Sequence, residues 1–271
     1  MYKWQYMINN NIKNIWNYRN FIIANVKRDF QIKYQKSLLG AFWAVINPFC
    51  MIILYSVIFA GVMEAKIYGL NGDNKYIIYL CTGILTWTLF SEIISGCLNV
   101  FVINSNIIKK IKFPHLALPM SIVISSVLNF IIVFSIFLLF LLFNKVVIGV
   151  IYFAIIPILV IQVIFSFSIG IILGALNVFF RDMAQAFQFI IQIWFWLTPV
   201  VYTIEIIPSK LAKYISLNPI TPLMNAYRDI LVRNTLPAWE GLLPMVYLTT
   251  TLLVLGLIVF SKIDAEMIDE L

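Results

Sequence analysis

A stripe of polar side chains at helical spacing runs through one of the long apolar stretches of this chain. It consists of Thr88, Glu92, Ser95 and Asn99, at positions i, i+4, i+7 and i+11. Polar groups within an apolar helix are costly unless they face another helix or water. The stripe therefore predicts either hydrogen bonds between helices or the wall of a polar path.

A second stripe lies further along the chain, in another apolar stretch. It consists of Gln185, Gln188, Gln192 and Trp196, at positions i, i+3, i+7 and i+11. The same two interpretations apply, because glutamine amides form hydrogen bonds equally well with a neighbouring helix or with a polar solute.

Four tryptophans also lie within apolar stretches: Trp43, Trp87, Trp194 and Trp196. Tryptophan commonly anchors a protein at a membrane interface. The alternative is a lining for a sugar-bearing solute, because aromatic faces can also pack against the C–H groups of sugar rings. If these residues line a path, the candidates are Trp43, Trp87, Glu92, Gln188, Gln192, Trp194 and Trp196.

Catalytic and metal-binding motifs are missing from this sequence. It contains no GxxxxGK[ST] loop for ATP, no HExxH and no cluster of Cys and His at metal-ligand spacing. The single histidine, His115, is expected to be a solvated loop residue. Glu92, the only acid in an apolar stretch, has no histidine or base beside it. We therefore expect no catalytic residues, no metal and no cofactor in this chain.

The elements that carry these residues are six apolar stretches, each long enough to cross a bilayer as a helix. Hydrophobic residues make up 62% of the chain and charged residues 11%. A bilayer core of roughly 30 Å requires about 20 apolar residues, and its lack of water favours helices. We predict an all-α polytopic membrane protein, a single domain over 1–271, with spans at about 41–62, 76–103, 116–144, 146–180, 183–204 and 241–261.

Basic residues predict the orientation of these spans. They are concentrated before the first span and in the 104–115 connection, and the positive-inside rule then places both termini in the cytoplasm. The net charge of +7 reflects this bias together with attraction to anionic lipid. A nucleic-acid partner is not expected, because there is no basic soluble domain.

Four connecting regions are distinctive. Residues 11–36 repeat apolar residues at helical spacing and predict an amphipathic interface helix, with a solvated basic leader as the alternative. Residues 104–115 are basic and contain Pro114. The short FFRDM connection at 179–183 is either a plain helix break or a contact for a cytosolic partner. Residues 202–240 are Pro-rich and predict short helices at the outer interface.

Two segments resemble a known family: RDFQIKYQKSLLGAFWAVINPF at 28–49, and 177–231, which begins NVFFRDMAQAF. With the six spans, they resemble the permease subunit of bacterial ABC exporters for lipid-linked polysaccharide. This family exports O-antigen, capsule and wall teichoic acid. The resemblance implies a multi-pass protein of the bacterial cytoplasmic membrane and covers essentially the whole chain.

The resemblance also implies partners. Two copies of the permease would form the pore, and two cytosolic ABC ATPase subunits would bind below, carrying the ATP and Mg²⁺. The substrate would be an undecaprenyl-linked glycan, a polyprenyl pyrophosphate that enters from the membrane lipid of the cytoplasmic leaflet. The alternatives are a permease of the same fold that exports a drug or another lipid, and a self-contained membrane enzyme or channel.

Residue roles follow from the same resemblance. The 104–115 region would be the coupling helix, and 205–235 would be external gate helices. The residues implied in ATPase coupling are Asn106, Lys109, Lys110, Phe113, Arg181 and Asp182. Those implied in attracting the pyrophosphate head group are Arg28, Lys33 and Lys36, although positive-inside topology is the simpler explanation of these three residues.

Overall fold

A computed structural model describes residues 18–34, 46, 50, 53–54, 73–111, 113–204, 207–264 and 266–270. The elements in these residues are helices joined by turns, as the apolar stretches predicted. They are α2 (Arg19–Tyr34), α4 (Asp73–Ile103), α5 (Ser105–Ile108), α6 (Ala117–Phe143), η3 (Val150–Ala154), α7 (Ile155–Phe179), α8 (Asp182–Trp196), α9 (Ser209–Ser216), α10 (Ile220–Leu231), α11 (Trp239–Ile263) and α12 (Met267–Glu270).

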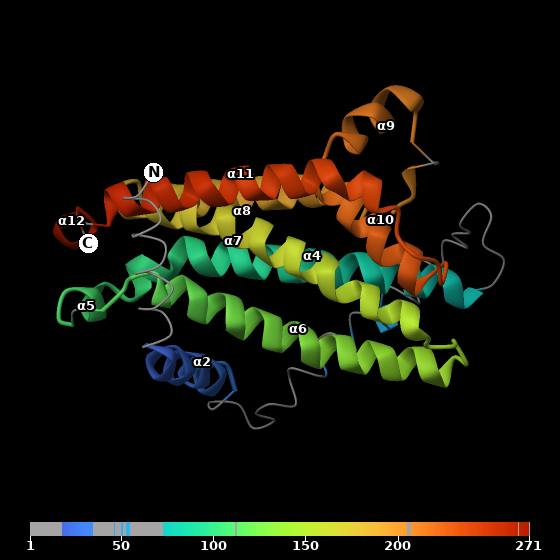
Figure 1. Ribbon diagram of the computed structural model, residues 1–271, viewed down its shortest axis with the longest axis horizontal. Coiled ribbons are helices and arrows are strands. Elements are labelled where there is room, and N and C mark those ends of the chain that lie inside the picture. The colour runs from blue at the N-terminus through green and yellow to red at the C-terminus, as the bar shows by residue number, and fades with distance from the viewer. Residues whose placement is uncertain are drawn as a thin grey trace.

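Helix α4 forms the centre of the bundle. It packs against α7 along one side and against α6 along another, and α11 covers the far side of α7 (Figure 1). Ile93, Ile94, Cys97 and Leu98 of α4 are fully buried. The predicted stripe therefore shares its helix with the core of the molecule.

Close packing of α4 on α7 depends on two glycines of α7. A Cβ added at Gly170 would lie 2.7 Å from Cys97 Cβ, and one at Gly174 would lie 2.4 Å from the Cys97 carbonyl oxygen. Small residues at this spacing allow helix backbones to approach closely. The Ser166-Gly170-Gly174 pattern in the sequence thus serves helix packing.

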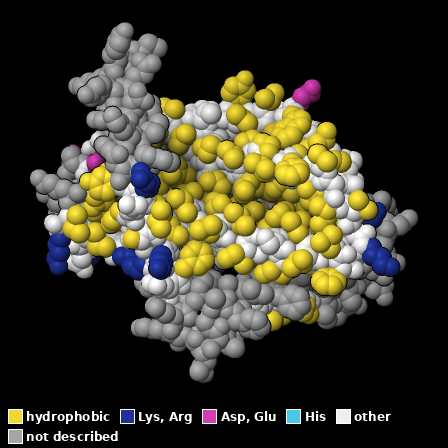
Figure 2. All heavy atoms as spheres, turned by 60° about the horizontal axis from the view of Figure 1, so that its bottom comes forward, with side chains coloured by type: hydrophobic (Ala, Val, Ile, Leu, Met, Phe, Trp, Pro, Cys, Tyr) yellow, Lys and Arg dark blue, Asp and Glu magenta, His cyan; other side chains and the backbone are white. Residues whose placement is uncertain are grey.

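The outer surface of the bundle suits a hydrocarbon environment. Within the described residues, four helices are long and apolar enough to cross a membrane, at 75–103, 117–143, 150–179 and 239–263. Figure 2 shows hydrophobic side chains covering the middle of one face, with Lys and Arg at its two ends. On α6 the outward-facing residues include Ile124, Leu128, Ile131, Leu139 and Leu142.

Two of the predicted spans have different bounds in the structure. The 183–204 stretch is not one helix, because α8 ends at Trp196 after 15 residues and the chain then turns. At 1.5 Å per residue, α8 is only about 22 Å long. The 146–180 stretch begins with irregular backbone and the short η3 before α7. Of the predicted span at 41–62 only residues 46, 50, 53 and 54 are described, so six spans remain a prediction.

The end of α8 has a local cause. Pro199 has no amide hydrogen and disfavours helical backbone at the residue before it. The Thr198 hydroxyl donates to the Trp194 carbonyl at 2.7 Å, and the Asn218 amide donates to Leu197 O at 3.2 Å and to Thr198 Oγ1 at 2.7 Å. These bonds pair polar groups that the interrupted helix leaves without partners.

The predicted interface helix is described from Arg19 onward as α2, which packs against α6. Ile22 and Val26 are buried as expected, but Ile23 is 61% exposed and Asn25 is buried. The helix therefore presents a narrower apolar face to the bundle than its sequence spacing predicted. Residues 11–17, 35 and 36 of this prediction lie outside the described residues.

Short helices follow α8, as the Pro-rich segment predicted. Helix α9 lies on the surface, whereas α10 packs against α4 and α7 and buries most of its side chains. Figure 1 places α9 and α10 toward one end of the bundle and α5 and α12 at the other. The helices predicted to be external, α9 and α10, thus lie at the opposite end of the bundle from α5 and α12, which are predicted to be cytoplasmic.

Replacing Gly174 with Ala is expected to destabilise the protein by about 1–3 kcal/mol, because the added methyl group overpacks the α4–α7 contact. Gly241→Ala is the matched control, since a Cβ there meets nothing within 4 Å. The measurement is thermal unfolding of the purified protein in detergent. Equal melting temperatures for the two variants would contradict this account of the packing.

Candidate functional site

Helix α8 has two chemically different faces. Its glutamines Gln185, Gln188 and Gln192 are exposed, and Trp196 is 65% exposed beside them. The opposite face carries Phe187, which is buried, and Trp194, which is half-buried against α4. The second sequence stripe is therefore one continuous exposed surface of the single chain.

Trp87 and Trp194 belong to an aromatic cluster on the inner face. The Trp87 ring lies 5.4 Å from Phe90 and 5.5 Å from Phe195, and Trp194 meets Phe90 edge-on at 5.2 Å. Trp87 is buried, and the Trp194 indole nitrogen donates to Asn218 Oδ1 at 3.1 Å. In this single chain the two residues lie inside the packing between helices and are separated from the exposed α8 stripe. Trp43 lies outside the described residues.

Glu92 lies on a different side of α4 from this cluster. Its Oε2 accepts a hydrogen bond from Asn129 Nδ2 of α6 at 3.0 Å. The first sequence stripe thus contributes a bond between helices at this position, the simpler of its two interpretations. Asn129 was missed by the sequence analysis, which considered only histidine or a base as partners for Glu92.

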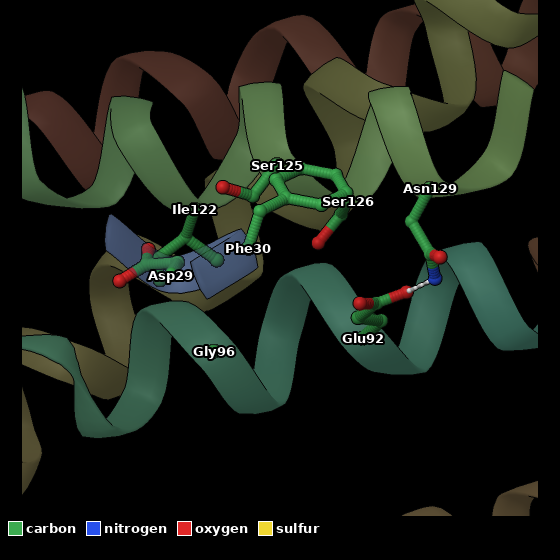
Figure 3. A pocket seen from close by; sticks show the side chains of 8 residues that line it. All are labelled: Asp29, Phe30, Glu92, Gly96, Ile122, Ser125, Ser126 and Asn129. Atoms are coloured by element: carbon green, nitrogen blue, oxygen red, sulfur yellow. Dashed lines mark hydrogen bonds between the residues drawn. The ribbon is translucent and has the colours of Figure 1, made fainter. Parts of the chain in front are cut away.

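A small cavity adjoins Glu92, where α2, α4 and α6 meet. Its volume is about 190 Å³. The lining residues are Asp29, Phe30, Glu92, Gly96, Ile122, Ser125, Ser126 and Asn129 (Figure 3). Burial raises the pKa of the Asp29 carboxyl, and the neighbouring Arg28 guanidinium opposes that rise.

The basic residues predicted to attract a head group are only partly described. Arg28 is 41% exposed, and its Nη2 donates to Asn104 Oδ1 at 3.1 Å. This bond connects α2 to the junction between α4 and α5. Lys33 belongs to α2, but its side chain, like the whole of Lys36, lies outside the description.

The predicted coupling region contains an exposed tip and a buried anchor. Asn106, Lys109 and Lys110 are exposed on and just after α5. Phe113 is buried instead, with its ring 4.8 Å from Phe21 of α2 and 5.4 Å from His115. The tip is therefore available to a partner, while Phe113 holds the connection against the bundle.

His115 is buried, so its prediction as a solvated loop residue is wrong. Its Nδ1 lies 2.7 Å from Asp264 Oδ1, just after α11. This pair joins two segments that are 149 positions apart in sequence. The sequence contains no local signal for it, because the contact depends on α11 returning to the end of the bundle where α5 lies.

Arg181 and Asp182 lie at the junction of α7 and α8, and both are exposed. The Asn177 side chain organises this turn by accepting from the Ala184 amide at 3.1 Å and donating to Leu98 O at 3.0 Å. The turn is therefore fixed to α4, while its charged residues remain accessible.

A buried arginine organises the opposite end of the bundle. Arg228 of α10 is 4% exposed, and its Nη2 donates to Pro199 O at 2.6 Å and to Val200 O at 2.9 Å. Its guanidinium carbon lies 3.5 Å from the centre of the Tyr79 ring, in cation–π geometry. Burial lowers the pKa of Arg228 to about 10, so the side chain stays charged at neutral pH.

The sequence analysis did not single out Arg228 as a site residue. The apolar residues around it in α10, Tyr227, Ile230 and Leu231, are all buried. An arginine within an otherwise apolar helix face could have predicted this buried site. A buried guanidinium in that position requires carbonyl or aromatic partners.

Replacing Arg228 with Ala is expected to destabilise the protein by about 2–4 kcal/mol, since two buried carbonyls lose a charged donor. Arg233→Ala is the control, because Arg233 is exposed and pairs only with Asp229, an interaction of less than about 1 kcal/mol. Thermal unfolding in detergent measures both variants. A loss no larger for Arg228→Ala than for Arg233→Ala would refute a structural role for the buried guanidinium.

Comparisons with known proteins agree with this architecture. The family model for ABC-2 type transporters matches residues 20–232. Two O-antigen export system permease proteins RfbA from Klebsiella pneumoniae are 31% and 30% identical, each over 90% of this chain and 92% of the relative. A third, from Myxococcus xanthus, is 28% identical over 89% of this chain and 92% of its own length. This chain therefore belongs to the ABC-2 type transporter family and is a membrane transport subunit.

Proposed function

We propose that this chain is the permease subunit of an ATP-driven exporter that moves undecaprenyl-linked polysaccharide across the bacterial cytoplasmic membrane. The observation that carries the proposal is its similarity to O-antigen export permeases over about nine-tenths of its length. O-antigen is accordingly the first substrate class to test, ahead of capsule and teichoic acid. Both termini would lie in the cytoplasm, in agreement with the positive-inside bias.

The exposed stripe of α8 supports a translocation path between two copies of the chain. Three glutamine amides and Trp196 are exposed on a helix whose surface beyond Asp182 at its start is otherwise apolar. Amide groups are unfavourable in hydrocarbon, so this stripe is better placed against a second copy or against water. A homodimer with the two α8 stripes facing its centre satisfies that requirement.

Chemically, the stripe suits a glycan. Glutamine amides donate and accept hydrogen bonds, which matches sugar hydroxyls, and the Trp196 face can pack on sugar C–H groups. Repeated weak contacts allow a polymer to leave each position in turn. Trp87 and Trp194 would support this surface from behind.

At the other end of the bundle, α5 and the α7–α8 turn offer exposed charges to a cytosolic ATPase. Lys109, Lys110, Arg181 and Asp182 are exposed there, and Phe113 would transmit movement of the tip into α2. Two ATPase subunits would bind the ATP and Mg²⁺. Arg28, Lys33 and Lys36 would attract the pyrophosphate of the incoming substrate.

The decisive experiment measures the ATPase activity of the permease co-purified with its ATPase partner, with and without undecaprenyl-linked glycan. Stimulation by the glycan is expected. Failure to form a complex with an ABC ATPase would contradict the proposal, and stimulation only by small amphiphiles would exclude the polysaccharide as substrate while leaving the fold assignment intact.

Trp196→Ala is expected to lower the export rate several-fold, because an aromatic contact contributes about 0.5–1.5 kcal/mol. The melting temperature should stay unchanged, since the side chain is exposed. Trp239→Ala, at a partly exposed tryptophan that begins α11, is the control. Equal export by both variants, measured as glycan reaching the far side of proteoliposomes, would exclude Trp196 from the path.

Charge reversal at the α5 tip should uncouple the ATPase. Lys109→Glu combined with Lys110→Glu is expected to weaken ATPase binding about tenfold or more, because each exposed contact contributes up to about 1 kcal/mol. Lys210→Glu, at the opposite end of the bundle, serves as the control. Unchanged binding and glycan-stimulated activity in the double variant would show that these lysines only set the topology.

A further inference from the structure

The segment that follows α8 has four successive backbone carbonyls, at residues 199–202, that accept hydrogen bonds from side chains. Arg228 Nη2 donates to the first two, at 2.6 and 2.9 Å. The Tyr76 hydroxyl donates to the third at 3.2 Å, and the Tyr79 hydroxyl donates to the fourth at 2.9 Å. Two helices, α4 and α10, thus hold this non-helical segment carbonyl by carbonyl.

The surface of α4 is shaped to receive the segment. Tyr76, Tyr79 and Gly83 are at positions i, i+3 and i+7 and share one face of the helix. A Cβ added at Gly83 would lie 2.5 Å from Val200 O and 3.0 Å from Arg228 Nη2. The segment therefore passes directly over the α4 backbone, and both tyrosines beside it are buried.

The three donors also hold one another. The Arg228 guanidinium carbon lies 3.5 Å from the centre of the Tyr79 ring, so the ring that carries the fourth donor also supports the cation. A buried charge costs more than a neutral donor, and ionisable side chains at membrane depth usually have a functional role. We call Tyr76, Tyr79 and Arg228 the carbonyl clamp.

The clamp connects to the exposed stripe of α8 through Tyr202. The carbonyl of Tyr202 is held by Tyr79, and its hydroxyl turns back to donate to the Trp196 carbonyl at 2.7 Å. Trp196 is the last residue of α8 and is 65% exposed. Because most of its ring lacks packing partners within the single chain, the position of the indole depends on the backbone that the clamp and Tyr202 fix.

We propose that the carbonyl clamp is a set of positioning residues that hold Trp196 at the end of the glycan path. This inference rests on the proposed function, and it assigns a transport role to side chains that do not themselves reach the path. Tyr79 acts through Tyr202, and Tyr202 acts through the Trp196 backbone. The clamp thereby directs the aromatic face that meets the sugar.

A double-mutant cycle distinguishes positioning from simple stabilisation. Tyr79→Phe removes the hydroxyl that holds Tyr202 but keeps the ring beneath Arg228. In the full permease–ATPase complex in proteoliposomes, we expect it to lower the glycan export rate about threefold, the size of one net hydrogen bond. In a Trp196→Ala background the same substitution should cause no further loss, because the two residues act as one unit. Losses that multiply in the double variant would overturn the proposal.

Tyr227→Phe is the matched control. The Tyr227 hydroxyl is buried without a partner among the described residues, and it lies one position before Arg228 in α10. Its removal should leave both the export rate and the melting temperature unchanged. Tyr202→Phe, which breaks the last bond of the chain of contacts, should reproduce the effect of Tyr79→Phe. An export rate for Tyr202→Phe equal to that of the control would contradict the proposed connection to Trp196.

A second measurement reports the position of Trp196 without any substrate. The complex is labelled with 5-fluorotryptophan, and the fluorine resonance of Trp196 is assigned by its loss in Trp196→Phe. The resonance should shift or broaden in Tyr79→Phe but not in Tyr227→Phe, and an unchanged resonance in Tyr79→Phe would overturn the clamp. A lack of glycan-stimulated ATPase activity in the unmodified complex would instead contradict the proposed function, so the two failures are distinguishable.

Discussion

Close approach of α4 and α7 is the constraint on which the rest of the bundle depends. Gly170 and Gly174 bring the α7 backbone against Cys97, and this fixes how deeply α4 is buried. With α4 at the centre, α6 and α11 are left to cover its remaining side and the outer side of α7. In hydrocarbon, where apolar side chains gain little by leaving lipid, such shape complementarity supplies much of the association energy.

A second constraint acts wherever the helices are interrupted. Backbone carbonyls at the end of α8 have no helical partners, and a bilayer offers no water to replace them. Asn218 pairs with the turn directly, and Arg228 reaches the Pro199 and Val200 carbonyls from α10. The backbone at the end of α8 is therefore stabilised by Asn218, which lies between α9 and α10, and by Arg228 of α10. Because Arg228 must reach these carbonyls, α10 is buried, whereas α9 remains on the surface.

Much of this architecture could be predicted from the sequence, because a membrane-spanning helix requires an uninterrupted run of apolar residues and such runs are visible in the sequence. Helices α4, α6, α7 and α11 follow directly from that rule. The length of α8 was overestimated, since an apolar run continues through Pro199 although the helix does not. Hydropathy indicates that a segment lies in an apolar environment, but it does not indicate the residue at which the helix ends.

The site was less accessible to sequence reasoning for a different reason. Helical spacing placed Gln188, Gln192 and Trp196 on one surface, because periodicity along a single helix is a local property. It could not reveal that Trp87 and Trp194 pack inside, or that Asn129 pairs with Glu92, because those facts depend on which helix lies alongside. Partners from distant parts of the chain become visible only once the bundle is assembled.

The contact between His115 and Asp264 has a mechanical consequence. Residue 115 follows the α5 segment and precedes α6, whereas residue 264 ends α11, so the pair joins three helices at one point. Movement of the α5 tip would therefore reach the last long helix directly, through this 2.7 Å contact, as well as its neighbours in the chain. The α5–α6 connection and the end of α11 are held together at the end of the bundle where α5 and α12 lie.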